Sequence, residues 1–326
     1  MAKLHNLTSK TTGIRGIHSN FSRILKAIGD TSNMYYYEGM LNKAVYSLKV
    51  STEFLELPEI QLADKAKFLQ TCGKIMVNTY FYTGSGDDLI NATLNSLQEM
   101  ANELHDKFLM ANSIFLKGQN QYYHNLVTGK PEIQVAQKTL MNGANLLEEA
   151  GDMFNLPESL IFVGLTFEME GNRGRARDYY IRAMNLAEQH KNKFALSLAF
   201  RHLTDHVDGE ERLQFALKSL RLREEMKFKL TLPLSNLLVS EIYADRSEFR
   251  KATDYCRKAE RLANKMNLQN ALVFVFLTYS RLEELTGKKD NSLEYARKGM
   301  DLAESLKIAF SVSAAAQRVK AATERD

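Results

Sequence analysis

The sequence predicts an all-α protein, built as an array of about seven similar helical hairpins and closed by one further helix. The chain of 326 residues contains only 4 prolines and 17 glycines, so long stretches lack the residues that break helices. Apolar residues recur at helical intervals, and one short motif returns about every 40 residues. A period of this length is typical of stacked units that cannot bury their apolar faces alone.

The repeated motif places an aromatic residue first, a small residue four positions later and a leucine three positions after that. One copy consists of Tyr179, Ala183 and Leu186. The further copies are Phe215, Ser219 and Leu222; Tyr255, Ala259 and Leu262; Tyr295, Gly299 and Leu302; and a fainter one at Thr139, Gly143 and Leu146. This spacing puts the three residues on one helix face. The small central residue lets a neighbouring helix approach closely.

These residues resemble the tetratricopeptide repeats, whose unit is two antiparallel helices. In that family an aromatic or apolar residue lies late in the first helix, a glycine in the turn and a small residue early in the second. Phe167, Gly171 and Ala176 match this pattern, and Val163-Gly164 stands where the family has Leu-Gly. The same spacing recurs at Tyr243, Ser247 and Ala252, and at Tyr35, Gly39 and Ala44. The resemblance implies a right-handed α-solenoid over residues 20–306.

The expected hairpins begin near residues 20, 62, 107, 157, 194, 231 and 270. Two features depart from the family: no tryptophan occurs, and the longer period implies longer helices. Pro58, Pro157 and Pro233 each fall where a first helix should begin, a position at which proline is tolerated. A closing helix is expected from Lys307 to Thr323, with Phe310 on its inner side, and residues 307–326 form this capping helix and tail.

The first 19 residues are expected to form a basic N-terminal arm or cap. The first 29 residues contain five basic side chains and no acid, and Ile14, Ile17, Phe21 and Ile24 recur at helical intervals. The favoured interpretation is a helix that covers the open end of the array. An organelle transit peptide and a basic arm that docks on an anionic surface remain alternatives.

Charge and cysteine content narrow the class of protein. The net charge is +4, and because the first 29 residues contribute +5, the remaining 297 residues sum to −1. Because the charges of residues 30–326 nearly cancel, the sequence gives little reason to expect a nucleic-acid partner. The longest apolar runs, such as Ala271 to Leu277, are too short to span a membrane. Isolated Cys72 and Cys256 favour a reducing compartment, hence the cytoplasm, with an organelle as the alternative.

Two segments carry residue types that chemistry often uses. "TGSGDD" (Thr83 to Asp88) lacks the preceding strand of a phosphate-binding loop, so we expect a turn inside the second hairpin, with an aspartate capping the next helix. His202 and His206 lie four residues apart and resemble half of a zinc site. With no third ligand evident, a solvated helix end is favoured. The sequence predicts no catalytic residue, metal ligand or cofactor.

The resemblance implies that the first helices line the concave side of the superhelix. The matching inner positions are Asn125, Leu165, Arg201, Glu241 and Arg281, and the last three recur at 40-residue steps. One interpretation is a charge ladder that keeps neighbouring hairpins in register. The other is a polar strip that binds a peptide, and its full predicted set is Gln121, Asn125, Arg201, Asn236, Glu241, Tyr243 and Arg281. Since no paired lysine accompanies Gln121 and Asn125, the family's clamp for chaperone tails is incomplete.

The predicted function is therefore a non-enzymatic adaptor or scaffold that binds a protein or peptide segment in a concave groove. The alternative is a peptide- or ligand-responsive signalling regulator whose superhelix changes pitch on binding. No nucleic acid and no membrane span are expected, and the sequence leaves the oligomeric state open. An enzyme would instead show a deep pocket with converging titratable groups.

Overall fold

The computed structural model describes residues 2–324 of the chain, and the side chains of residues 20–324. Within residues 2–324 there are α-helices and short 3-10 helices but no strand, which confirms the all-α prediction. No helix of this described part is long and apolar enough to cross a membrane. The α-helices are α1 (Ala2–Tyr37), α2 (Leu41–Lys49), α3 (Leu62–Thr83), α4 (Asp87–Glu103), α5 (Lys107–Thr128), α6 (Ile133–Ala150), α7 (Leu156–Met169), α8 (Arg173–Gln189), α9 (Lys193–Leu203), α10 (Gly209–Glu225), α11 (Leu232–Asp245), α12 (Phe249–Met266), α13 (Gln269–Leu285), α14 (Lys289–Leu306) and α15 (Ala309–Thr323).

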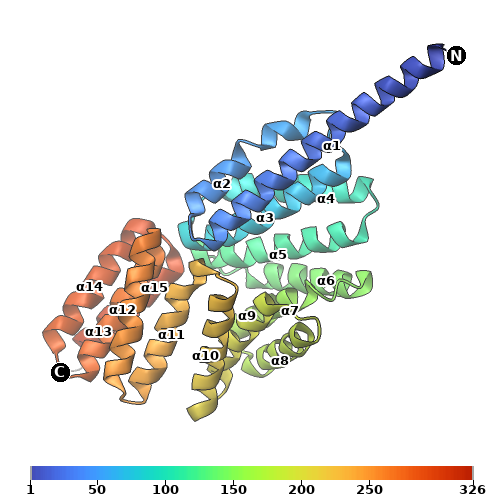
Figure 1. Ribbon diagram of the computed structural model, residues 1–326. Coiled ribbons are helices and arrows are strands. Elements are labelled where there is room, and N and C mark those ends of the chain that lie inside the picture. The colour runs from blue at the N-terminus through green and yellow to red at the C-terminus, as the bar shows by residue number, and fades with distance from the viewer. Residues whose placement is uncertain (1, 325–326) are drawn as a thin grey trace.

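The helices pack as consecutive hairpins. In the described part of the chain, the first fourteen α-helices pair into seven hairpins, from α1–α2 to α13–α14, and α15 packs on the last one (Figure 1). Short 3-10 helices η1 (Thr52–Glu56), η2 (Thr204–His206) and η3 (Lys229–Thr231) lie in three of the connections. The predicted array of about seven hairpins with a closing helix is thus confirmed, and stacking neighbours bury the apolar face that each hairpin exposes alone.

The small residues of the repeated motif lie where the two helices of a hairpin touch. All of them are buried: Gly143, Ala183, Ser219, Ala259 and Gly299. A Cβ atom on Gly143 would come within 2.9 Å of the backbone of Phe115 in the partner helix. The Oγ of Ser219 donates a hydrogen bond to the Ser197 carbonyl at 2.7 Å. The interpretation of the motif as a close-approach site is correct.

The aromatic residue of the motif stacks on a ring of the first helix in the same hairpin. In α7–α8 the rings of Phe167 and Tyr179 lie 5.5 Å apart and nearly parallel. Tyr243 and Tyr255 make the same contact in α11–α12 at 5.6 Å, and the ammonium group of Lys251 lies 5.1 Å from the centre of the Tyr243 ring. These pairs add to the apolar contact between the helices.

Two turns differ in detail from the expectation. Pro157 and Pro233 do lie in the first turns of α7 and α11, whereas Pro58 precedes α3 by four residues in the loop after η1. In "TGSGDD" the N-cap of α4 is Gly86, which provides no side-chain cap. Asp87 lies in the first turn of α4 and accepts a hydrogen bond from the Asn120 amide at 3.2 Å. The carboxylate thus binds the next hairpin and does not cap its own helix.

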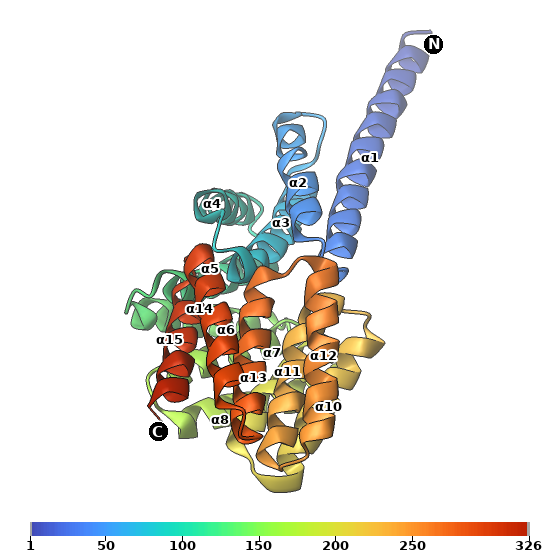
Figure 2. The same cartoon turned by 90° about the vertical axis from the view of Figure 1, so that its left-hand side faces the viewer.

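The array curves until its last hairpins lie against its first ones (Figure 2). The rings of Phe81 in α3 and Phe310 in α15 stack at 5.1 Å, so Phe310 faces inward as expected. The Asn270 amide in α13 donates to the Phe81 carbonyl at 3.4 Å. After α10, Lys229 forms an ion pair with Glu38 at 2.6 Å. We call these contacts the seam. They close one turn of the superhelix around an interior space.

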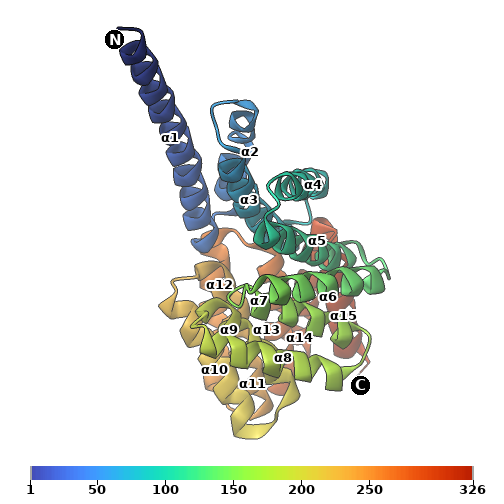
Figure 3. The same ribbon diagram turned by 90° about the vertical axis from the view of Figure 1, so that its right-hand side faces the viewer.

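Helix α1 is longer than the other first helices, and its N-terminal part projects from the body (Figure 3). Only its C-terminal part packs in the first hairpin, where Ala44 of α2 is fully buried and Gly39 makes the turn with a positive φ of 77°. The predicted basic arm falls on residues 1–19, whose side chains lie outside the described residues.

Candidate binding cavity

A cavity of about 550 Å³ lies inside the turn of the superhelix. Its wall is formed by α1, α3, α5, α7, α9, α11, α13 and α15, the inner layer of the array. Among the described residues that line it, one side chain comes from the second helix of a hairpin, Arg223 of α10. A volume of this size is ordinary for a ligand site. The cavity occupies the concave side on which the sequence placed its binding strip.

Nine of the twenty described residues that line the cavity are phenylalanine or tyrosine. Phe310 stacks on Phe81 and on Phe274 at 5.1 and 5.9 Å. On the opposite side the ring of Phe162 meets that of Tyr123 edge-on at 5.5 Å. Phe194 contacts Phe228 at 5.7 Å. Flat rings held by such contacts provide apolar surface at little entropic cost.

Tyrosine hydroxyls supply hydrogen-bonding groups within this apolar wall. Burial raises the pKa of Tyr36 and Tyr123, and it raises the pKa of Tyr82 to about 12. All three side chains are therefore neutral at physiological pH. Among the described side chains, the hydroxyls of Tyr36 and Tyr82 have no hydrogen-bond partner. They are available to a bound molecule as donors or acceptors.

Glu158 is the buried acid of the wall. Its side chain is 3% exposed and its Oε2 atom accepts a hydrogen bond from Lys74 at 3.1 Å. The Oε1 atom is buried and has no partner among the described residues. The ammonium of Lys74 also lies 5.1 Å from the centre of the Phe194 ring. Lys74 thus compensates the charge of the Glu158 carboxylate, and the Oε1 atom can accept a hydrogen bond from a bound molecule.

Two of the three charged residues of the predicted ladder line the cavity, Arg201 and Glu241. Arg201 forms an ion pair with Asp205, one turn further along, at 2.8 Å. Arg281 lies outside the lining and pairs with Asp245 of the neighbouring hairpin. Burial raises the pKa of Glu241 although the charges of Arg281 and Arg201 oppose this. Each arginine of the row thus has an aspartate as its partner, and no ion pair among the described residues joins Arg201, Glu241 and Arg281 to one another.

The other four predicted residues lie elsewhere. Asn125 is buried, and its Oδ1 atom accepts a hydrogen bond from the Glu132 backbone at 2.9 Å, which holds the turn between α5 and α6. The Asn236 amide donates to the Leu232 carbonyl at 2.8 Å. Tyr243 belongs to the aromatic pair with Tyr255. Gln121 is half-buried on α5, with its Oε1 atom unpaired. None of the four lines the cavity.

His202 and His206 are not a solvated helix end. His202 lines the cavity, stacks on Tyr180 at 5.3 Å, and has a pKa lowered well below 6.5 by burial and then by the charges of Arg201 and Arg223. The side chain of His206 is 3% exposed, with Nε2 at 3.4 Å from a carboxylate oxygen of Glu168. No cluster of three or more metal-ligating side chains occurs among the described residues. Packing against Tyr180 thus leaves the His206 ring buried and the His202 ring half-buried.

Arg223 was missed by the sequence reasoning. It lies in the last turn of α10 with 5% of its surface exposed. Its Nη1 atom donates to the Ser235 hydroxyl at 2.5 Å, and its Nε atom is buried without a partner among the described residues. Burial lowers the pKa of Arg223 to about 10, so the guanidinium stays charged at neutral pH.

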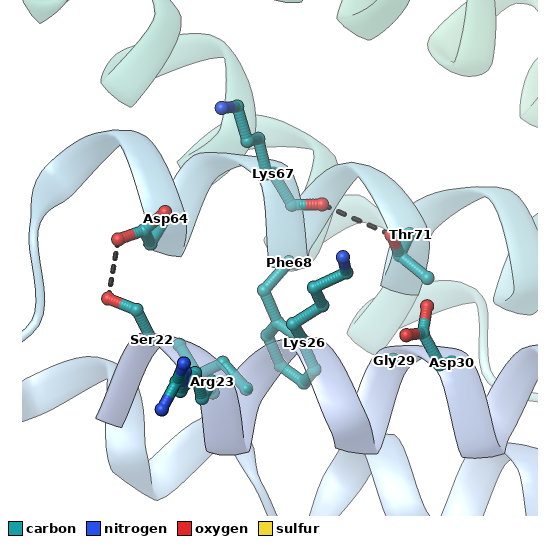
Figure 4. A pocket seen from close by; sticks show the side chains of 10 residues that line it. Ser22, Arg23, Lys26, Gly29, Asp30, Asp64, Lys67, Phe68 and Thr71 are labelled. Carbon is teal, nitrogen blue, oxygen red and sulfur yellow. Dashed lines mark hydrogen bonds between the residues drawn. The ribbon is translucent and has the colours of Figure 1, made fainter. Parts of the chain in front are cut away.

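A second hollow of about 550 Å³ lies between α1 and α3 (Figure 4). Its rim carries three cations, Arg23, Lys26 and Lys67, and two acids, Asp30 and Asp64. The Ser22 hydroxyl donates to Asp64 at 2.5 Å. Only two helices form this hollow, and its charges nearly balance. It offers less converging chemistry than the central cavity.

No protein-family model and no curated protein matches the chain. Among solved structures it is similar to a Rap protein complexed with competence and sporulation factor, with 12% identity over 92% of this chain and 86% of that chain and a TM-score of 0.63. It is also similar to aspartyl phosphate phosphatase F from Bacillus subtilis, with 12% identity over 93% and 94% and a TM-score of 0.52. A signal-transduction ATPase with a tetratricopeptide repeat sensor from Pyrococcus horikoshii shares 16% identity over 89% of this chain and 46% of that chain, with a TM-score of 0.53. The chain thus has a tetratricopeptide-like helical-repeat fold.

Proposed function

We propose that this chain binds a protein or peptide segment in the central cavity and performs no chemistry of its own. The observation that carries the proposal is the composition of the wall: helices from all parts of the array together contribute aromatic faces and polar atoms without a partner among the described residues to one space. Concave surfaces of helical repeats suit extended segments, because successive repeats each contact a part of the segment.

The arrangement of titratable groups supports a binding role over catalysis. The cavity is lined by Glu158, Arg201, His202, Arg223 and Glu241. A nucleophilic site needs a serine, cysteine or similar group within hydrogen-bonding distance of a base. His202 has no hydrogen bond to any described side chain, and its contact is the ring of Tyr180. Both cysteines are buried away from the cavity, and burial raises the pKa of each thiol.

A second candidate is a regulator whose superhelix changes pitch when a ligand binds. The seam favours it, because the first hairpins meet the later part of the array through few polar contacts, such as the ion pair of Glu38 with Lys229. A ligand between them shifts the equilibrium between open and closed forms if it binds one form better. The similar Rap protein was solved with competence and sporulation factor bound, which supports ligand binding by this kind of fold.

The binding role is tested by filling the cavity. Half-buried Leu198 lines the wall, whereas Val135 is 55% exposed on α6. We expect wild-type protein to retain members of a pool of randomised synthetic hexapeptides after gel filtration, as measured by mass spectrometry. Leu198→Trp should reduce retention at least about tenfold by occupying the space, and Val135→Trp should not. Equal retention by both variants would place the binding outside the cavity.

The same peptides distinguish the adaptor from the regulator. Small-angle scattering of the protein with and without the retained peptides measures its radius of gyration. A change in this radius on binding supports the regulator, and an unchanged profile supports the adaptor. As a control, Glu38→Gln weakens the seam without touching a residue that lines the cavity. In a regulator this variant should expand in the absence of peptide.

A further inference from the structure

The repeated motif has a fourth position, one residue after its leucine, which is buried in every copy. Four copies place a small or apolar residue there, Leu147, Ala187, Ala263 and Ala303, and each is 0% exposed. The copy in α10 has Arg223 at this position. Burying a cation in a site built for alanine is unfavourable for folding. An arginine at this point in the array therefore calls for a functional reason.

The side chain of Arg223 reaches the central cavity from the outer layer of helices. It is 5% exposed, and one of its donors is used by the Ser235 hydroxyl at 2.5 Å. A second donor, Nε, is buried without a partner among the described residues. A planar guanidinium with unused donors is the group that best matches a carboxylate, because it can form two parallel hydrogen bonds.

Among the described arginines that line the cavity, Arg201 has an ion pair and Arg223 has none. Glu158 is paired with Lys74 at 3.1 Å, and Arg201 with Asp205 at 2.8 Å. Glu241 lies in the field of Arg201 and Arg281. Among the side chains of residues 20–324, no carboxylate lies within ion-pair distance of Arg223.

The neighbours of Arg223 also favour an anion. The charged group that acts on it is Arg201, a second cation, and the tyrosines beside it are Tyr82 and Tyr36. The neutral hydroxyls of these tyrosines can donate to an oxygen held by the guanidinium. One unpaired positive charge matches one negative charge, so a carboxylate fits better than a doubly charged phosphate.

We propose, on the basis of the peptide-binding role above, that Arg223 binds a carboxylate of the bound peptide. The carboxylate is either the C-terminal one or that of an aspartate or glutamate side chain. The bound segment would supply the counter-ion that the folded chain lacks, so its acidic group would fix its direction and register in the cavity. Arg223 is a specificity-determining residue in this arrangement.

The experiment uses four pools of randomised synthetic hexapeptides. They carry either a free C-terminal carboxylate or an amide, and either include or omit Asp and Glu. Wild-type protein should retain peptides with a carboxylate at least about tenfold more than amidated, acid-free ones, as expected for a charge-assisted hydrogen bond. Arg223→Gln should abolish this preference. Arg221→Gln, which removes an exposed arginine from the same helix, should keep it.

The pattern among the pools identifies the source of the carboxylate. A preference that follows the free terminus indicates a tail carboxylate, and one that follows Asp and Glu indicates a side chain. Retention that is equal in all pools, or a preference that survives in Arg223→Gln, overturns the proposal and leaves the peptide-binding role intact. If wild-type protein retains no pool at all, the peptide-binding role fails, and this inference with it.

A stability measurement separates a binding role of Arg223 from a structural one. Without peptide, Arg223→Met removes an uncompensated buried charge and keeps the volume of the side chain. We expect an unchanged Tm or one raised by about 1–3 °C, measured by circular dichroism. A Tm lowered by several degrees would show that Arg223 stabilises the array itself and would overturn the proposal.

Discussion

Hairpins α9–α10 and α11–α12 share one backbone plan but differ at two positions that are apolar and buried in the second hairpin. Both hairpins place an aromatic pair between their helices, tilted at 5.4 Å in the first and stacked at 5.6 Å in the second. At the two positions in question, α9–α10 has His202 and Arg223, and α11–α12 has Ile242 and Ala263. Ile242 is 2% exposed and Ala263 is 0% exposed. The stacking of hairpins therefore requires apolar side chains at these positions, and α9–α10 departs from that requirement.

The polar residues of α9–α10 and the apolar residues of α11–α12 face different surroundings. His202 and Arg223 both line the central cavity, whereas Ile242 and Ala263 do not. Their charges interact, since Arg223 is one of the groups that lower the pKa of His202. Two polar exceptions lie in one hairpin and line the same cavity, as expected if this cavity is the binding site proposed above. This difference between the hairpins can be tested by placing an arginine in α12, by following the stability with pH, and by removing the ion pairs of Asp245 and Asp205.

The largest effect is expected when an arginine, as found at position 223 of α10, is placed at the matching position 263 of α12. Ala263→Arg places an unpaired cation in a fully buried position of α12, where no cavity receives it. We expect the free energy of unfolding, measured in urea, to fall by at least about 3 kcal/mol. Ala263→Met adds volume without charge and should cost less. If the two variants lose equal stability, crowding and not charge sets the requirement.

The sequence was sufficient to predict the repeated hairpins, but it was not sufficient to predict the cavity. The spacing of Tyr179, Ala183 and Leu186 predicts a local contact, because side chains at these intervals lie on the helix face that packs on the partner helix. The cavity depends on how far the superhelix turns, which brings Phe81 against Phe310. No local pattern encodes a contact between residues so distant in the chain. Glu241 lines the cavity and Tyr243 does not, because an inner and an outer position of one helix lie only two residues apart.

Arg223 was nevertheless detectable from the sequence. The five copies of the motif align without a gap, and the position after the leucine is apolar in four of them. In a repeat array, a polar residue at a position that is elsewhere apolar is the local signal for a site, because the copies themselves supply the comparison.

A pH titration tests the second polar exception. The folded pKa of His202 is lowered, mainly by burial, so the ring is neutral in the native state and takes up a proton on unfolding below its ordinary pKa of about 6.5. The folded state should therefore lose stability as the pH falls below about 6.5, by up to about 1.4 kcal/mol per pH unit. His202→Ile, which copies α11, should remove this contribution. Parallel stability curves for variant and wild type between pH 7.5 and 5.5 would contradict it.

The smallest effect concerns the ion pairs that link the hairpins. Asp245 at the end of α11 pairs with Arg212 of α10 at 2.7 Å and with Arg281 of α13, so it joins three hairpins. Asp205, its counterpart in η2, pairs with Arg201 of α9 in the same hairpin. Because these groups are about one-third exposed, we expect Asp245→Asn to cost about 1 kcal/mol or less, and Asp205→Asn to cost less still.

The same variants decide between the two interpretations of the Arg201, Glu241 and Arg281 row. If the row is a structural ladder, the loss in Asp245→Asn should shrink in 1 M NaCl, because salt screens exposed charges, and retention of the hexapeptide pools should not change. If Arg281 takes part in binding, freeing it from Asp245 should alter which peptides are retained. Unchanged stability together with altered retention would reject the ladder and favour the strip.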